Sequence, residues 1–287
     1  MKKINPVRIN DPLYLDTLAE NTLLAATSFP ELKREKANVI KAYDDYDANA
    51  GNVWNIPIPT ISGKLLSGLL SHYDSPPESL NFLDRITKSS PEVCPMCGGF
   101  KPSTRDHILP KAQYQILAIF SKNLVPACDC NMKRNDAVKG DPATQARILH
   151  PYYDGIMSDR LLSCEITHKD NFRIFNLKII YVNPAHPEIA AIKYHTKNVV
   201  IKSGAEGWLK GQLSKIKERP SNVIQTLPRK RHQSVAQVID CINDCLDRNE
   251  ELTGTPNNWL SILCHGILNS AGVVDWITDR HNATLVT

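Results

Sequence analysis

The stretch CPMCGGFKPSTRDHILPKAQYQILAIFSKNLVPACDCNMKRND, residues 94–136, decides how the rest of the chain is interpreted. It combines two pairs of cysteines with an adjacent acid and imidazole, Asp106 and His107, and with three asparagines. Thiolate, imidazole, carboxylate and carboxamide groups are the side chains that bind metals in proteins. In this part of the sequence, residue types and spacing together predict chemistry.

The four cysteines predict a structural zinc site. Cys94 and Cys97 are separated by two residues and followed by two glycines, which permit the tight turn that aims both sulfurs at one ion. Cys128 and Cys130 form the second pair. Four thiolates complete a tetrahedron and leave no open position for a reaction, so we expect this metal to hold structure. The single spacer residue of the second pair is shorter than the usual two and strains this geometry.

A second site is predicted between the cysteine pairs. Asp106 and His107 read as part of a strand, residues 123–126 as the return strand, and Asn131 as the beginning of a helix. Because adjacent strand residues point to opposite faces, Asp106 and His107 share a site only if the strand twists or ends there. Asn131 and Asn135 are four residues apart and share a helix face. Their oxygen ligands, with that of Asp106, suit Mg²⁺ or Mn²⁺.

These residues resemble the HNH, or ββα-metal, nuclease family. The resemblance rests on Cys94-x2-Cys97, Asp106-His107 with Pro110, Asn123-Leu124-Val125-Pro126, Cys128, Cys130-Asn131 and the basic Lys133-Arg134 before Asp136. It implies that Asp106 and Asn131 hold the catalytic metal and that His107 is the general base that activates water. It also implies that Asn123 orients His107 and pins the loop between the strands, that Asn135 is an additional candidate ligand, and that the four cysteines hold zinc.

The residue types fit this chemistry. A neutral imidazole can take a proton from water at cellular pH, and a divalent cation neutralises charge on the scissile phosphate. Lys111, Lys133 and Arg134 are suitable for contacts with backbone phosphates, which position a strand without reading its sequence. We therefore expect a metal-dependent HNH endonuclease that hydrolyses DNA. The alternative is a catalytically degenerate zinc-binding module that binds nucleic acid or a partner.

The segment His150-Pro-Tyr-Tyr-Asp, taken with Asp106-His107 and Cys130-Asn131, is similar to PtuB-like HNH proteins of bacterial anti-phage systems. This resemblance implies an ATPase partner, which we expect to dock on the helices from Pro187 onward. A second possibility is a stand-alone nuclease that binds DNA through residues 210–231. That segment holds seven Lys or Arg against one Glu.

The whole chain sets weaker limits. Its 287 residues can bury a core without disulfides, and a net charge of +4 is too mild to establish a polyanion partner. No apolar run follows the charged start, and the longest apolar run, residues 259–268, is too short to cross a bilayer. We therefore expect a cytoplasmic protein with no membrane partner, whose eight cysteines are metal ligands or core residues.

The predicted fold class is α+β: a mostly helical chain with an embedded ββα-metal motif, stapled by a four-cysteine zinc site and followed by a small β-hairpin. Helices are expected within residues 11–50, 62–73, 77–90, 205–217 and 233–248, and hairpin strands at 160–168 and 172–183. We expect a helical region over residues 1–90, the nuclease motif with its zinc over 91–150, and a part for target recognition or partner docking over 151–287. The other cysteines are expected to pack in the core: Cys164, Cys241, Cys245 and Cys264.

Overall fold

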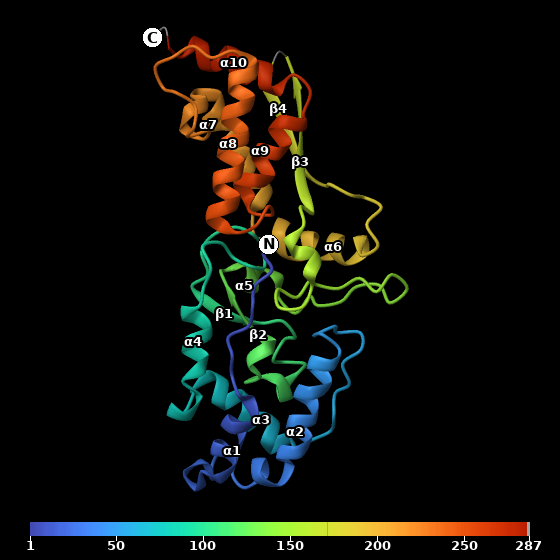
Figure 1. The fold of residues 1–287 in the computed structure, drawn as a ribbon. Helices are drawn as coiled ribbons and strands as arrows, with labels where there is room; N and C mark the ends of the chain where they lie inside the picture. The colour runs from blue at the N-terminus through green and yellow to red at the C-terminus, as the bar shows by residue number, and fades with distance from the viewer. Residues whose placement is uncertain (171, 286–287) are drawn as a thin grey trace.

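The computed structural model describes residues 1–170 and 172–285 and has an α+β fold. About half of the chain is helical, and the strands of the described residues form two separate two-stranded antiparallel sheets. Figure 1 shows an elongated molecule with the N-terminal helices at one end, one small sheet in the middle, and the other sheet with the C-terminal helices at the far end. The predicted fold class is confirmed at this level.

Four α-helices build the N-terminal end: α1 (Asp11–Glu20), α2 (Glu31–Ala48), α3 (Gly63–Asp74) and α4 (Phe82–Lys88). They fall within the segments predicted to be helical. Each turns an apolar stripe inward, as α3 does with Leu65 and Leu69, which are fully buried. Ser62 begins α3, because its side chain accepts a hydrogen bond from the backbone N–H of Leu65.

The middle of the molecule is a short hairpin followed by a short helix. β1 (Thr104–His107) pairs antiparallel with β2 (Leu124–Ala127), with His107 opposite Leu124, and α5 (Cys130–Arg134) follows. All residues of β2 are buried, whereas in β1 only His107 is, so β2 is the inner strand of the hairpin and β1 reaches the surface. The predicted order of strand, strand and helix is confirmed, but α5 ends before Asn135, where a longer helix was expected.

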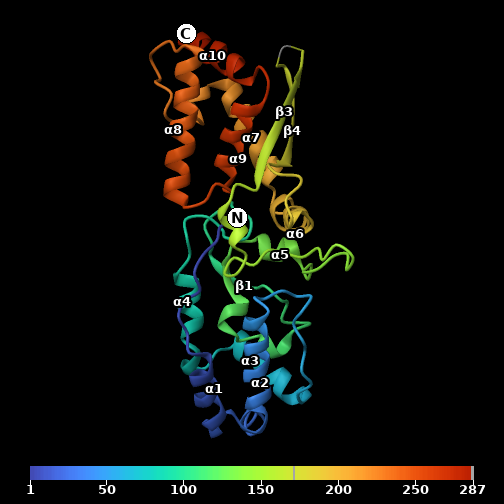
Figure 2. The same cartoon turned by 45° about the vertical axis from the view of Figure 1, so that its right-hand side comes forward.

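The C-terminal end combines a hairpin with helices. Its elements are β3 (Leu162–Lys169), β4 (Ile174–Tyr181), α6 (Ile189–His195) with a π-helical continuation (Thr196–Ile201), α7 (Ala205–Glu218), α8 (Val235–Thr253), α9 (Trp259–Asn269) and α10 (Val273–Ala283). The hairpin lies along α9, and α9 packs on α8, as Figures 1 and 2 both show. The hairpin after the central stretch is therefore confirmed.

Helix α9 corresponds to the longest apolar run of the sequence. It is buried on most sides between α8 and β3, which explains why its sequence is apolar almost throughout. Among the described residues no single helix has the length and apolar character to cross a membrane. Only α9 and α10 taken together, bent by 102° at their break, reach that length and composition.

The buried apolar side chains form one cluster that runs from Met1 to Ile277. The division into three parts at residues 90 and 150 stays a prediction. Three of the cysteines outside the central stretch are buried within this cluster, and one is half-buried at its edge: Cys164, Cys245 and Cys264, and Cys241 respectively. Their predicted role in packing is consistent with these positions.

Candidate functional site

The four cysteines of the central stretch meet at one buried point. Their sulfur atoms all lie within 4.8 Å of one another, and none of the four residues is more than 4% exposed. Two of the separations are 3.6 Å, from Cys94 to Cys130, and 3.5 Å, from Cys97 to Cys128. A tetrahedral zinc site with Zn–S bonds of about 2.3 Å requires sulfur separations of roughly 3.8 Å. The cluster can therefore hold a metal such as zinc.

Different elements deliver the two pairs. Cys94 and Cys97 lie in the turn before β1, whereas Cys128 follows β2 and Cys130 begins α5. The short spacing of the second pair was expected to strain the site. The start of the helix removes that difficulty, because Cys130 turns back far enough for its backbone N–H to lie 3.5 Å from the Cys128 sulfur. The cluster therefore ties the hairpin to the helix.

The turn that carries the first pair is packed tightly. The backbone N–H of Gly98 donates to the carbonyl of Cys94 at 2.8 Å, and that of Gly99 reaches the Cys97 sulfur at 3.4 Å. Gly98 has a φ of +76°, and a Cβ there would collide with the backbone of Met1 and Asn257. Only glycine fits both the backbone conformation and the space.

Asp106 and His107 line a pocket of about 370 Å³ beside this cluster, because β1 ends at His107. Asn131 and Asn135 line the same pocket, together with Tyr73, Arg105, Pro110, Lys111, Ala112, Met132, Arg134 and Asp136. The structure thus brings the predicted ligands and the predicted base to one cavity. Asn131 and Asn135 do not share a helix face, since Asn135 lies beyond α5 with a φ of +54°.

The imidazole of His107 is held in one tautomer. Its Nε2 lies 2.8 Å from the carbonyl oxygen of Ala118, which can only accept, so Nε2 carries the proton and Nδ1 keeps its lone pair. The ring packs on Tyr73 with centroids 4.3 Å apart. Burial lowers the pKa of His107 to about 4, so the ring is neutral at pH 7. No described residue donates a hydrogen bond to Nδ1, so its lone pair has no partner among the described residues.

Asp106 is paired inside the protein. Its Oδ2 accepts a hydrogen bond of 2.9 Å from Nη2 of Arg134, whose guanidinium also donates to the carbonyls of Ile108 at 3.0 Å and His107 at 2.6 Å. Burial raises the pKa of Asp106, and the Arg134 charge opposes that rise. Arg134 is only 2% exposed, whereas a phosphate contact on the surface was expected. Cys130 and Arg134 share the buried face of α5, which turns this cation inward.

The two predicted lysines differ in position. Lys111 lines the pocket, pairs with Asp74, and lies 4.7 Å from the centre of the Tyr73 ring. Lys133 is exposed and forms an ion pair of 2.7 Å with Asp129. Both ammonium groups remain near the surface, where a phosphate can reach them.

Asn123 pins the loop between the strands. It is fully buried, and its Nδ2 donates to the carbonyls of Leu109 at 3.1 Å and Leu117 at 3.3 Å, while its Oδ1 accepts from the Leu109 N–H at 2.8 Å. It forms no hydrogen bond to the His107 ring. Its effect on His107 is indirect, because the loop that it fixes also carries the carbonyl of Ala118.

A buried relay that the sequence did not predict extends from Asn123. The Tyr46 hydroxyl donates to Asn123 Oδ1 at 3.2 Å and lies 2.9 Å from Nε2 of His150. Nδ1 of His150 accepts from the Tyr152 N–H at 3.1 Å, so Nε2 carries the proton and donates to Tyr46. The His-Pro-Tyr-Tyr-Asp segment therefore supports the loop behind His107. Its residues lie far from the loop in sequence, and no local spacing connects them.

Removing the relay should destabilise the protein. We expect Tyr46→Phe to lower the free energy of unfolding by about 1–3 kcal/mol, because the buried ring of His150 loses the Tyr46 oxygen and Oδ1 of Asn123 loses the Tyr46 donor. Tyr43→Phe is the matched control, since the Tyr43 hydroxyl is buried without a hydrogen-bond partner and its loss should cost little. Urea denaturation of both variants measures the difference. Equal midpoints for the two variants would show that the relay does not contribute to stability.

The same relay predicts a loss of stability in acid. Burial lowers the pKa of His150 to about 3, so the folded protein keeps this ring neutral while the unfolded chain binds a proton below its usual pKa of about 6.5. Stability should therefore fall as pH drops from about 6.5 towards 3, by up to about 1.4 kcal/mol per pH unit for this group. Urea denaturation of the wild type and His150→Gln between pH 7 and pH 5 tests this. The variant should show the shallower slope, and parallel slopes would contradict the assignment.

Comparison with protein-family models, with curated proteins and with solved structures finds no match to this chain.

Proposed function

We propose that this chain is a metal-dependent endonuclease that hydrolyses phosphodiester bonds of DNA with the chemistry of the HNH family. The observation that carries the proposal is the pocket that Asp106, His107 and Asn131 line together, with His107 held in the neutral tautomer whose Nδ1 carries no proton. A general base must lie in a cavity next to the ligands that position the phosphate. Asp106 and His107 on β1 and Asn131 on α5 meet this requirement.

The oxygens of Asp106 and Asn131 would hold Mg²⁺ or Mn²⁺, since both ions prefer hard oxygen ligands. When bound, the cation supplies neutralisation of the scissile phosphate and of the leaving oxygen. His107 would take the proton of the attacking water on Nδ1, while the Ala118 carbonyl keeps the ring oriented through Nε2. Lys111, at the edge of the pocket, would contact a backbone phosphate.

The Arg134 guanidinium has a different part in this proposal. It neutralises one oxygen of Asp106 and fixes the end of β1 through two carbonyls. Asp106 would then bind the cation through its other oxygen. We further propose that zinc occupies the four-cysteine cluster, because thiolates at these separations select it over harder ions.

A second candidate function is a zinc-stapled module that binds nucleic acid or a partner without catalysis. The buried ion pair of Asp106 with Arg134 favours it, because the carboxylate already has a counter-ion within the protein. Asn131 favours it as well, since its Oδ1 accepts a hydrogen bond of 2.7 Å from the neighbouring backbone N–H of Met132. Both side chains would have to change partners to bind a cation.

Cleavage of supercoiled plasmid by the purified chain distinguishes the two functions. We expect relaxed and linear products with added Mg²⁺ or Mn²⁺ and none without them. A chain that binds plasmid but leaves it intact under every metal condition supports the non-catalytic module.

The cellular role is proposed on the resemblance alone. We infer a cytoplasmic nuclease of an anti-phage system whose residues 187–287 dock an ATPase subunit. Co-purification of the ATPase with the full chain, lost when exposed residues of that segment are substituted, would support this role. A monomer that is fully active by itself and that binds DNA through the basic segment 210–231 would support the stand-alone nuclease instead.

A further inference from the structure

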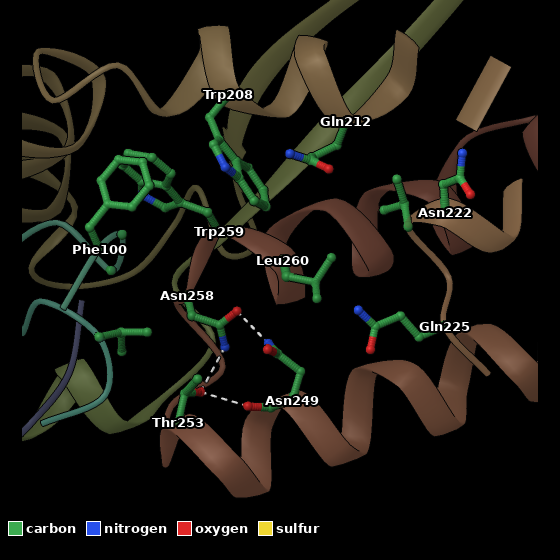
Figure 3. A pocket seen from close by; sticks show the side chains of 14 residues that line it. Phe100, Trp208, Gln212, Asn222, Gln225, Asn249, Thr253, Asn258, Trp259 and Leu260 are labelled. Carbon is green, nitrogen blue, oxygen red and sulfur yellow. Dashed lines mark hydrogen bonds between the residues drawn. The ribbon is translucent and has the colours of Figure 1, made fainter. Parts of the chain in front are cut away.

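A second pocket, of about 320 Å³, lies against the turn that follows Cys97 and is lined there by Gly98, Gly99 and Phe100 (Figure 3). The turn at residues 98–100, α7, the segment 222–225, α8 and the start of α9 enclose it. It shares no lining residue with the pocket of Asp106 and His107. Its volume lies within the range of small-molecule sites.

Aromatic side chains form one wall of this pocket. Trp259 is buried and fixed, because its Nε1 donates to the carbonyl of Cys97 at 2.8 Å. Phe100 meets it edge-on with ring centroids 5.4 Å apart, and Trp208 lies 5.7 Å away at a tilt. Figure 3 shows the three rings gathered at one end of the cavity. Phe100 is 60% exposed, so part of its ring is accessible to a ligand.

Carboxamides form the rest of the polar lining. Asn249 and Asn258 bond to each other and to neighbouring hydroxyls, so their positions are set. The side chains of Gln212, Asn222 and Gln225 form no hydrogen bond with any described residue, although they line the same cavity. Each offers two donors and an acceptor. No described Asp, Glu, Lys, Arg or His lines the pocket.

We propose that this pocket binds a nucleobase. The half-buried ring of Trp208 and the exposed ring of Phe100, set at angles around the buried Trp259, offer surfaces on which a planar ligand can stack, since bases stack on Trp and Phe whatever their identity. Free carboxamides match the mixed donors and acceptors on the edge of a base, and the lack of charge suits a neutral ring. The inference goes beyond the proposed hydrolysis and rests on it only in taking nucleic acid as one source of the base.

Two sources share this chemistry: a base of a nucleic-acid strand and a free nucleoside. The spacing of α7 favours the strand. Trp208, Gln212 and Lys215 follow one another at intervals of four and three residues and lie on one face of α7, and Arg219 comes directly after the helix, where its guanidinium donates to the Arg229 carbonyl. Both cations are exposed and would meet the phosphates beside a bound base.

Binding measurements without added Mg²⁺ or Mn²⁺ test the proposal, because no strand is then cut. The probes are the four deoxynucleosides, a ten-nucleotide single strand and methyl glucoside, titrated calorimetrically against the full chain. We expect Trp208→Ala to weaken binding of the strand by about 5- to 150-fold, as loss of one stacked base does. Asn222→Ala and Gln225→Ala should weaken it without affecting folding, since both side chains are exposed and unbonded.

Asn38→Ala is the matched control, because Asn38 is an exposed carboxamide on α2 and lies outside the pocket. Binding of nucleosides that the pocket variants weaken identifies free nucleosides as ligands. Binding of the strand alone, with a log-salt slope that Lys215→Ala and Arg219→Ala flatten, identifies a base within a strand. The proposal would be overturned if the pocket variants bound every probe with the same affinity as the control Asn38→Ala. It would also be overturned if methyl glucoside were the single probe that bound.

The outcome is separate from that of the nuclease proposal. If the chain cleaves plasmid but its pocket variants bind every probe normally, only the base-pocket proposal fails. If the chain binds a base but cleaves no plasmid, only the nuclease proposal fails.

Discussion

His107→Ala should reduce metal-dependent plasmid cleavage by about 10²- to 10⁴-fold, the usual contribution of a general base. Burial lowers the pKa of His107 to about 4, so the ring is neutral, and its hydrogen bond to Ala118 leaves the lone pair on Nδ1 of a residue that lines the pocket of the predicted ligands. Alanine provides neither the lone pair nor the hydrogen bond to Ala118. Initial rates of plasmid relaxation at saturating Mn²⁺ measure the loss.

Two further variants separate chemistry from folding. His107→Gln can still donate to the Ala118 carbonyl but cannot act as a base, so it should fold as the wild type does and remain inactive. His186→Ala removes a histidine that lies outside the pocket and should retain full activity. Wild-type rates in both His107 variants would show that this histidine is not the base.

Substitution of one cysteine of the four-cysteine cluster should have the largest effect on stability. We expect the purified chain to carry about one zinc, measured by plasma mass spectrometry, as a four-thiolate site does. Cys97→Ser should remove it and lower the free energy of unfolding by more than about 4 kcal/mol, the range reached when a structural metal is lost. The reason is that all four thiols are buried at the junction of β1, β2 and α5, and only a cation lets them ionise together.

Cys241→Ser is the control, because Cys241 is half-buried on α8 and outside the cluster. It should keep the zinc and most of the stability. Cys128→Ser examines the pair with the short spacer and should lose the metal as Cys97→Ser does. Full zinc content in Cys128→Ser would mean that three cysteines hold the ion. A wild type that is stable with no metal would remove the zinc site altogether.

Local spacing accounts for what the sequence predicted correctly. The cysteine pairs, Asp106-His107 and the return strand lie within one short stretch, where turns and strand pairing alone bring them together. Residues 94–136 therefore yielded the cluster, the hairpin and the shared pocket. Helices with one apolar face were also found, since burial on one side leaves a period in the sequence.

Tertiary packing accounts for the rest. The inward turn of Arg134 depends on which face of α5 meets β1, and a basic residue after a zinc pair reads in sequence as a surface cation. The relay joins Tyr46, Asn123 and His150 across wide separations in the chain, so no window contains it. Helix α9 is enclosed on most sides, so its sequence is apolar almost throughout. The second pocket likewise unites α7, α8 and the cysteine turn only after folding.

Trp259 links two sites that would otherwise be independent. Its ring forms the wall of the second pocket, and its Nε1 and backbone N–H hold the carbonyls of Cys97 and Gly98 at 2.8 and 3.2 Å. If a metal in the four-cysteine cluster changes the affinity of a ligand in the second pocket by some factor, that ligand must change the affinity of the metal by the same factor. Metal titrations followed by indole fluorescence, with and without a pocket ligand, would measure this reciprocal coupling in a single experiment.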